Sequence, residues 1–544
     1  MKTVTLATLA ALPHTLLAAD YVWPGEHDHM EDLYMLQSGF SRFGFIDGIL
    51  TCGFNQGVPG RQNAAEWIRT AYHDMATYDT DTGLGGIDAS IMFETNREEN
   101  KGTAFDNTFG HLASFYSVKS GGADLLALAV VGSMAACNGY EIPLRVGRVD
   151  ATEAGQAGVP EPQQDLATHT EKFKKQGFNQ TEMIELVACG HTLGGVHGAN
   201  FPEITHDNTT GQVSHFEYGD SNAEFDNTVV TEYLSGNTSN LLVAGTNDTL
   251  NSDKRIFSAD GNATMEKLAD TKYFQTRCQD VMTKMIDTVP KDIVLSEPLK
   301  AIEVKPYINL LALNSNSTID FSGYVRVRYG KGAVHPSADD LSAFLTYKDR
   351  SGKNVTEPIT TTRPNWQSGT ATGFGGGYSF VFFEWTTQID ADAGISGFHI
   401  HLTTTSTGTT EVYDNVGNTY PVKDTVLYQM KQSCSLYVLN STTNAYDGQM
   451  TITAAVRSDS VADLNMHFAS KVARPGVILG RFETQVEPFV ATGKSMAGYD
   501  LYKVDGMPIN SDSGSTSFDI SLGDEMAVEF VRTTALTGQE CAEL

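Results

Sequence analysis

The sequence changes character near Glu297, and this change limits the chain to a fold with at least two kinds of domain. Residues 20–295 contain several segments with helical spacing of apolar residues, whereas from Glu297 onward Thr, Ser, Gly, Tyr and Val increase and apolar residues alternate. A chain of 544 residues is also too long for one hydrophobic core. We therefore expect a multidomain protein, mainly α over 20–295, followed by an all-β, sandwich-like region at 296–430 and a second β-rich region at 431–544.

Within these regions the periodicity of apolar residues predicts individual elements. Helices are expected at 65–74, 123–136, 165–176, 180–189 and 262–287, the last as one or two helices. Half-buried strands are expected at 324–329, 398–402 and 450–453. The seam between the two halves is expected between Pro290 and Pro298.

The charge and the first nineteen residues indicate a secreted, extracellular protein without nucleic-acid or membrane partners. Lys and Arg number 37 against 66 Asp and Glu, and the resulting net charge of −29 disfavours nucleic acid or an anionic membrane surface. Residues 1–19 combine one basic residue, an apolar run and small residues before Asp20, which is the pattern of a signal peptide. No later run is apolar and long enough for a transmembrane helix. Eight Asn-x-Ser/Thr sequons suit a glycosylated extracellular protein.

Six cysteines suggest three disulfides, because an even number of cysteines in a secreted chain is usually paired. Four lie in the first half and two in the second, and in chain order they are Cys52, Cys137, Cys189, Cys278, Cys434 and Cys541. The last two would close the second β-rich region. No CxxC pair is present, which argues against a zinc site.

One stretch of the helical region carries candidate chemistry. Arg69 and His73 are four residues apart in AEWIRTAYHD at 65–74, so they share one face of the expected helix. A neutral imidazole can accept a proton from one peroxide oxygen and return it to the other, while a guanidinium stabilises the negative charge that develops as the O–O bond breaks. The alternative is an ordinary surface pair, which is the more frequent origin of this spacing.

A second histidine, His191, follows an apolar helical segment in ELVACGHTLGG at 185–195, where a side chain can enter an internal cavity. Taken alone, it could equally be a buried histidine at a helix end, satisfied by a carbonyl group. Together with other motifs, however, this segment resembles the plant, fungal and bacterial haem peroxidase superfamily in order and spacing over roughly residues 40–290. The other motifs are RTAYHD at 69–74, GIDAS at 86–90, RVGRVDA at 145–151, GVPEPQQDLATHTEKFKKQGF at 158–178 and SDKRIFSADG at 252–261. The mixture looks like the hybrid-type secreted fungal peroxidases.

The resemblance implies one haem b per chain and roles for five residues. His191 would be the proximal iron ligand, and Asp253 would accept a hydrogen bond from its Nδ1, which favours a high-valent oxo-iron intermediate. On the distal side, His73 would act as acid and base and Arg69 would stabilise charge. Asn100 would accept a hydrogen bond from Nδ1 of His73, leaving Nε2 free as the base. The implied activity is the oxidation of small organic, phenol-type donors by H₂O₂.

The resemblance has two further implications for the helical region. Glu94 and Asn100, six apart in ETNREEN, match the family's pair behind the distal histidine, with solvated loop residues as the alternative. A disulfide between Cys52 and Cys137 is implied, and Cys189 with Cys278 is then the remaining pair, with a buried free thiol at Cys189 as the alternative.

Calcium is implied on both sides of the haem. Asp74, Asp88 and Ser90, with a carbonyl near Gly86, match the distal site, where hard oxygen ligands from one loop suit Ca²⁺; the alternative is turn capping by Asp and Ser. A second, proximal site would have a spacing one residue shorter than the family pattern, and its residues could instead be loop caps. Its ligands would be Thr192, Asp220, Asn222 and Asp226.

Departures from specialised members of the family narrow the class of donor. Gln62, Glu66 and His197 occupy the positions of three carboxylates in manganese-oxidising members, which argues against a Mn²⁺ site. Leu186 stands where lignin-oxidising members carry a surface Trp, and Asn200 where ascorbate-using members carry an Arg. Generic small donors remain, and the acidic surface disfavours anionic ones.

No family is identified for residues 296–544. His399 and His401 share one strand face and could bind a metal, although alternating polar residues are usually the wet face of a strand. Core packing is the usual role of large aromatic residues, but some could stack on sugar rings, and the candidates are Trp366, Tyr378 and Trp385. Polysaccharide or cell-wall contact through this region is one hypothesis. Another is that the whole chain is a non-enzymatic cell-wall or carbohydrate-binding protein that keeps a peroxidase-like fold.

Overall fold

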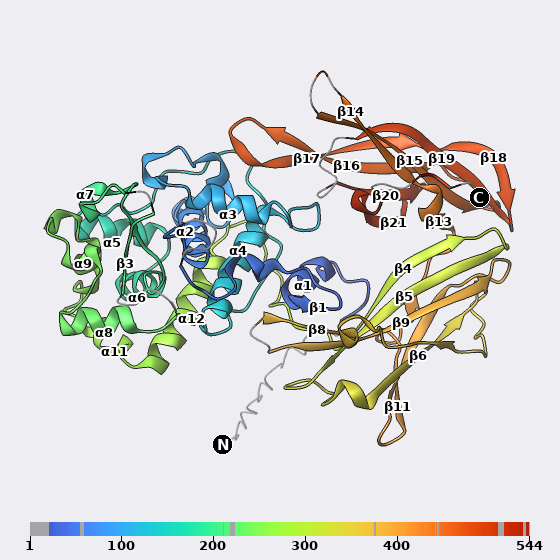
Figure 1. Cartoon of the computed structure of the whole chain (residues 1–544), viewed down its shortest axis with the longest axis horizontal. Helices are drawn as coiled ribbons and strands as arrows, with labels where there is room; N and C mark the ends of the chain where they lie inside the picture. Colours follow the sequence, from blue (N-terminus) through green and yellow to red (C-terminus); the bar gives the residue numbers. More distant parts are fainter. Residues whose placement is uncertain are drawn as a thin grey trace, which may run out of the picture.

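The computed structural model describes residues 21–54, 59–209, 211–217, 224–374, 377–440, 442, 445–509, 516–536 and 540–542. The signal peptide expected at 1–19 lies outside them. A helical body is followed by two pairs of β-sheets, which lie on one side of it (Figure 1). The expectation of a mainly α region followed by all-β regions is therefore confirmed.

The helical body contains every helix expected from the sequence, and residues 262–287 form two. Its helices are α1 (Asp28–Met35), α2 (Asn63–Met75), α3 (Ala104–Leu112), α4 (Gly122–Ala136), α5 (Leu166–Lys175), α6 (Gln180–Gly190), α7 (Pro202–Thr205), α8 (Thr228–Ser235), α9 (Leu241–Ala244), α10 (Ser252–Phe257), α11 (Ala263–Leu268) and α12 (Thr271–Asp287). A short ribbon of β2 (Gly195–His197) and β3 (Val213–His215) follows α6.

Two of these helices position the candidate site, and their sequences explain why they form. Helix α4 is apolar on all faces and is buried along nearly its whole length, so it is a core helix against which α2 packs. Helix α6 begins with a capping box, in which the Asn179 side chain accepts from the Glu182 amide and the Glu182 carboxylate accepts from the Asn179 amide. The cap fixes where α6 begins, and His191 then caps its C-terminal end.

The first pair of sheets forms a sandwich. Its strands in spatial order are β1 (Ser38–Gly39), β8 (Thr370–Thr372), β9 (Ser379–Asp390), β5 (Thr318–Tyr329) and β4 (Val304–Leu313), facing β11 (Thr409–Tyr413), β10 (Gly397–Thr404), β6 (Leu341–Lys348) and β7 (Ile359–Thr360), with β12 (Tyr420–Pro421) beside β10. The inward residues of both sheets share one core, as shown by alternation in β10, where Phe398, Ile400 and Leu402 are buried. His399 and His401 alternate with them and bind threonine hydroxyls instead of each other.

The second pair of sheets forms another sandwich with its own core. Its strands in spatial order are β13 (Val426–Tyr428), β15 (Ala445–Arg457), β19 (Tyr499–Ile509) and β18 (Val490–Met496), with β14 (Cys434–Asn440) beside β15, facing β17 (Val477–Pro488), β16 (Leu464–Arg474), β20 (Ser517–Leu522) and β21 (Glu525–Arg532). The three expected strands therefore lie in β5, β10 and β15. All three disulfides form, as Cys52–Cys137, Cys189–Cys278 and Cys434–Cys541.

The helical body is joined to the first sandwich by shared structure. Strand β1, from the beginning of the helical region, pairs antiparallel with β8, with Ser38 opposite Thr372. Glu31 on α1 binds the guanidinium of Arg326 and the ammonium of Lys305, and all three side chains are at most 3% exposed. The domain limits expected from the sequence remain predictions, but these contacts cross the one near residue 295.

Candidate active site

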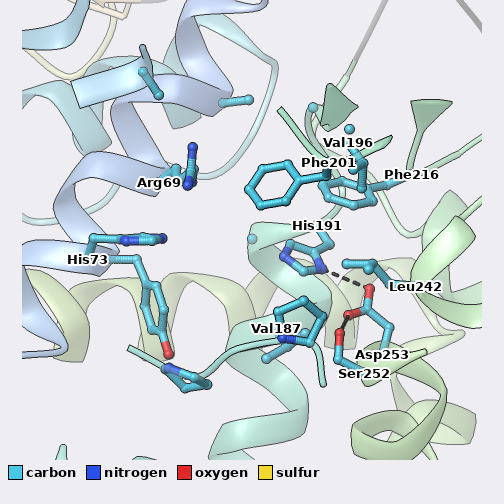
Figure 2. Close-up of a pocket in the computed structure, with 18 of the residues that line it drawn as sticks. Arg69, His73, Val187, His191, Val196, Phe201, Phe216, Leu242, Ser252 and Asp253 are labelled. Atoms are coloured by element: carbon cyan, nitrogen blue, oxygen red, sulfur yellow. Dashed lines mark hydrogen bonds and ion pairs between the residues drawn. The ribbon is translucent and has the colours of Figure 1, made fainter. Parts of the chain in front are cut away.

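A cavity of about 630 Å³ lies between α2 and α6 and brings the two candidate histidines into one site. Arg69 and His73 line it from α2, and His191 lines it at the end of α6. Figure 2 shows the two imidazoles on opposite sides of an open space, with Arg69 beside His73. The helical spacing of Arg69 and His73 therefore directs both side chains into an internal cavity and not to the outer surface.

The distal histidine is held by a hydrogen bond to the loop that follows α2. His73 Nδ1 lies 2.7 Å from Asn100 Oδ1, and Asn100 Nδ2 donates to the Glu94 carbonyl at 3.0 Å. The Glu94 carboxylate is fixed in turn by the Gly155 amide and by Arg97. Asn100 and Glu94 are 0% and 2% exposed, so they are buried residues and not solvated loop residues. With Asn100 Oδ1 as acceptor, Nδ1 carries the proton and Nε2 is the free base.

The electrostatic environment keeps His73 neutral. Burial and, secondarily, the positive charge of Arg69 lower the pKa of His73 to about 3. Burial also lowers the pKa of Arg69 to about 10, so its guanidinium stays charged at neutral pH. Arg69 donates to the Lys101 carbonyl at 3.0 Å and lies 4.7 Å from the centre of the Phe105 ring. The site thus combines a neutral base with a fixed cation.

On the opposite side, His191 is oriented by a buried carboxylate. Its Nδ1 lies 2.8 Å from Asp253 Oδ2, and the same oxygen accepts from Asn240 Nδ2 at 2.7 Å. The Asp253 side chain is only 1% exposed. Because Nδ1 is engaged, Nε2 is the nitrogen of His191 that remains for a ligand in the cavity.

Two residues that support His191 were not identified from the sequence. The Phe216 ring stacks on the imidazole at 4.3 Å between centroids and 15° between planes, and Asn240 shares the Asp253 carboxylate. Both lie in irregular segments without helical or strand periodicity. No local pattern could have revealed them, since they reach His191 only through tertiary packing.

The residues expected to form a distal calcium site lie together. Asp74 accepts from the backbone amides of Asp88 and Ile91 at 3.0 and 2.9 Å and lies 3.5 Å from the Ser90 hydroxyl. Burial and the Asp88 carboxylate raise the pKa of Asp74 well above its usual value. Gly86, at φ +106°, lies in the same loop, and a Cβ there would meet the Thr288 carbonyl at 2.6 Å. The bonds are those of a capped turn, and the two buried carboxylates are a donor set that a divalent cation would suit.

The proximal set is only partly described. Asp220 and Asn222 lie outside the described residues. Thr192 donates to the Asp226 carbonyl at 2.7 Å, and the Asp226 carboxylate caps the amide of Thr228. Glu217, which sequence reasoning missed, lies near Asp226, and burial raises its pKa to about 9. Over the described part of the chain, no group of three or more His, Cys, Asp or Glu side chains is arranged to hold a metal ion.

The three positions compared with a manganese site also line the cavity. Glu66 is engaged by Arg61 at 2.7 Å and by Asn107 at 3.2 Å, and Gln62 donates to the Cys52 carbonyl. The only carboxylate of the set is therefore already neutralised by an arginine.

The lining of the cavity also suits a largely apolar cofactor. Its walls include Phe173, Leu186, Val187 and Phe201, and the available ligand is the Nε2 nitrogen of His191. An imidazole fixed through Nδ1 by a buried carboxylate is the donor that iron in a porphyrin uses. The residues present therefore fit haem.

Comparison with known proteins agrees with this geometry. The sequence model of the family described as Peroxidase matches residues 53–275. A WSC domain-containing protein of Arthroderma benhamiae is 36% identical over 496 residues, which are 85% of this chain and 67% of that protein. L-ascorbate peroxidase 5, peroxisomal, of Arabidopsis thaliana is 30% identical over 203 residues, 37% of this chain and 68% of that protein. Peroxidase 22.3 of Oryza sativa subsp. japonica is 26% identical over 274 residues, 45% of this chain and 81% of that protein.

Proposed function

The chain belongs, through its helical region, to the plant, fungal and bacterial haem peroxidase superfamily, and we propose that it is a haem peroxidase that uses H₂O₂ to oxidise small organic, phenol-type donors. In this reaction H₂O₂ is reduced to two water molecules while two donor molecules each lose one electron and one proton. The observation that carries the proposal is the placement of Arg69 and neutral His73 across one cavity from His191 and Asp253.

Each residue has a defined task in this proposal. Haem held on Nε2 of His191 would supply the redox chemistry. His73 Nε2 accepts a proton from one peroxide oxygen and delivers it to the other, which then leaves as water. Arg69 stabilises the negative charge that develops on the leaving oxygen. Asp253 orients His191 and increases the electron density on its ring.

The donor is proposed from the walls and charge of the cavity. Phe201, Phe216 and Val159 give it apolar surface, while Glu98, Glu99 and Glu203 place carboxylates on its lining. Neutral phenols suit such a site better than anionic donors do. Ascorbate, which gives L-ascorbate peroxidase 5 its name, is anionic at neutral pH, and Asn200 stands here at the position of the family's ascorbate-site arginine.

The test uses the purified full chain supplied with haemin. A Soret band and peroxide-dependent oxidation of a phenol are expected, and His73→Leu should lower the rate with peroxide by about 100-fold or more while keeping the band. His399→Leu, on the distant β10, should change neither. A wild-type protein that binds haemin but oxidises no donor would favour the alternative function of a non-enzymatic wall-binding protein, and one that stays colourless would remove the peroxidase proposal.

Calcium at the distal loop is also proposed, supported by the buried Asp74 and Asp88 carboxylates. The cation would offset their mutual repulsion and tie the end of α2 to the loop. Metal analysis of the purified protein should find calcium, and Asp88→Ala should reduce its content. Unchanged calcium content in that variant would contradict the assignment. A second calcium at Thr192 and Asp226 is proposed on the resemblance alone.

Secretion and glycosylation are proposed from the leader-like residues 1–19, the sequons and the three disulfides, which persist in oxidising compartments. Among the described residues, no helix has both the length and the apolar character that crossing a membrane requires. Secretion can be measured as the disulfide-bonded, glycosidase-sensitive protein in culture medium.

A polysaccharide contact is proposed for the first sandwich, and the exposure of the Trp366 side chain supports it. Trp385 is 2% exposed, as core packing predicts, but Trp366 is 67% exposed, so the usual core role is wrong for it. It lies beside an open polar hollow of about 520 Å³ lined by Arg363 and Asn365, and the next residue, Gln367, has a left-handed φ of 50°. An exposed indole next to hydrogen-bonding groups suits a sugar ring.

Retention of the full chain on insoluble glucan and on chitin would test this contact. Trp366→Ala should lower retention, and Val412→Ala, an exposed apolar residue on β11, should leave it unchanged. Equal retention of all three proteins would exclude Trp366 as the contact.

A further inference from the structure

The hairpin formed by β16 and β17 extends from the second sandwich to the helical body, more than 350 residues away in sequence. In Figure 1 it projects beyond its sandwich toward α3. Its turn is Pro475–Gly476, with Gly476 at a φ of +74°. Leu479, just after this turn, is 0% exposed and belongs to the core of the helical body, not to the core of its own sandwich.

The hairpin contacts α3 and the 3₁₀ helix η2 (Ser90–Phe93) of the helical body, and the contact with η2 bears on the site. The guanidinium of Arg474 lies 4.7 Å from the centre of the Phe93 ring, and its Nη2 lies 3.2 Å from the sulfur of Met92. The same guanidinium donates to the Leu479 carbonyl at 2.9 Å, which fixes it across the hairpin. The side chain of Arg474 is half-buried, and these contacts restrain the position of η2 relative to the hairpin.

Tyr116 supplies a second anchor. Its hydroxyl donates to the Gly480 carbonyl at 3.2 Å, and its ring lies 4.8 Å from that of Phe482. The contact between the hairpin and the helical body therefore combines hydrogen bonds with apolar packing, and Leu479 is its fully buried residue.

The element that the hairpin holds leads directly to the distal histidine. Ile91, in η2, donates to the Asp74 carboxylate at 2.9 Å, next to His73. Glu94, the residue after η2, accepts from Asn100, and Asn100 holds His73. Displacement of η2 would thus reach His73 through two separate routes, one through its chain neighbour Asp74 and one through the Asn100 hydrogen bond to its imidazole.

We infer that the β16–β17 hairpin fixes the position of the loop on the distal side of the site and that Arg474 and Leu479 are positioning residues for His73. The C-terminal region is then needed for reaction with peroxide and is more than an appended binding module. This inference rests on the proposed peroxidase function.

The test compares peroxide and donor kinetics in haem-loaded full-length variants. Leu479→Ala and Arg474→Met should lower kcat/KM for peroxide by about 10- to 100-fold, because small displacements of a catalytic group have effects of that order. kcat/KM for the donor should stay within about twofold, and Arg474→Lys should recover part of the loss. Lys119→Ala, which removes an exposed ion pair to Glu529 in the same interface, is the matched control and should change neither.

Amide hydrogen exchange gives a readout that needs neither haem nor turnover. Exchange over residues 88–100 should become faster in Leu479→Ala and Arg474→Met, and not in Lys119→Ala. If Leu479→Ala fails to fold, Arg474→Met alone decides. Unchanged peroxide kinetics and unchanged exchange in a folded variant would overturn the inference, as would equal losses for peroxide and donor. A wild-type protein without turnover would instead refute the proposed function, and the exchange result would still decide whether the hairpin holds this loop.

Discussion

Removal of the Asp253 carboxylate should raise the reduction potential of haem bound to this protein. Asp253 Oδ2 lies 2.8 Å from Nδ1 of His191, and the side chain is 1% exposed, so little solvent screens the interaction. The negative charge favours the ferric state, which carries one more positive charge than the ferrous state. Asp253→Ala removes this preference.

The size of the shift follows from the hydrogen bond. A hydrogen bond to a charged group contributes about 1.5–3 kcal/mol, and for a one-electron couple about 1.4 kcal/mol corresponds to 59 mV. We take most of this contribution to be present in the ferric state and absent from the ferrous state. Asp253→Ala should then raise the midpoint potential by about 60–130 mV. Spectroelectrochemical titration of the Soret band measures this value directly.

Asp248→Asn is the matched control for this measurement. Asp248 lies in the segment just before Asp253. Its side chain is 78% exposed, and its carboxylate pairs with Lys254. The midpoint of Asp248→Asn should stay within about 20 mV of the wild type, since exposed charges are screened. If Asp253→Ala shifts the potential no more than Asp248→Asn does, the assignment of Asp253 as the partner of the proposed iron ligand His191 is refuted.

Three further predictions concern other parts of the structure. Asn100→Ala should lower kcat/KM for peroxide by about 10- to 100-fold, because His73 loses the acceptor that fixes its tautomer, and Asn100→Asp should keep most of the rate in the same stopped-flow assay. His29 lies between Phe43 and Phe530, and burial lowers its pKa to about 3. Folding thus favours the neutral form of His29. The free energy of unfolding does not depend on this group above about pH 6.5, and it falls by about 1.4 kcal/mol per pH unit as the pH decreases from there toward 3. His29→Phe should therefore gain melting temperature relative to the wild type as the pH falls through this range, and a constant difference would contradict the reasoning. Arg326→Met should cost about 3–5 kcal/mol in denaturant unfolding, because it leaves the buried Glu31 and Asp32 carboxylates with the single ammonium of Lys305, whereas Arg363→Met, whose partner is exposed, should cost under about 1 kcal/mol.

Local patterns in the sequence determined much of the fold and the centre of the site. The helical spacing in AEWIRTAYHD is sufficient to place Arg69 and His73 on one face of α2, and the alternation around Phe398 is sufficient to define the inner face of β10. The two β-rich regions also follow from composition, since alternating apolar residues must pair into sheets to bury one face. These features depend on interactions within a few residues, which a single sequence displays.

The tertiary structure alone decided which distant segments meet. Nothing near Leu479 indicates that it belongs to the core of the helical body, and nothing near Phe216 indicates that it stacks on His191. Trp366 and Trp385 look alike in sequence, yet one is exposed and the other buried. A side chain's own periodicity fixes only the face on which it lies, whereas its partner depends on how the intervening chain closes, so the surroundings of the two histidines were settled by packing between segments far apart in the chain.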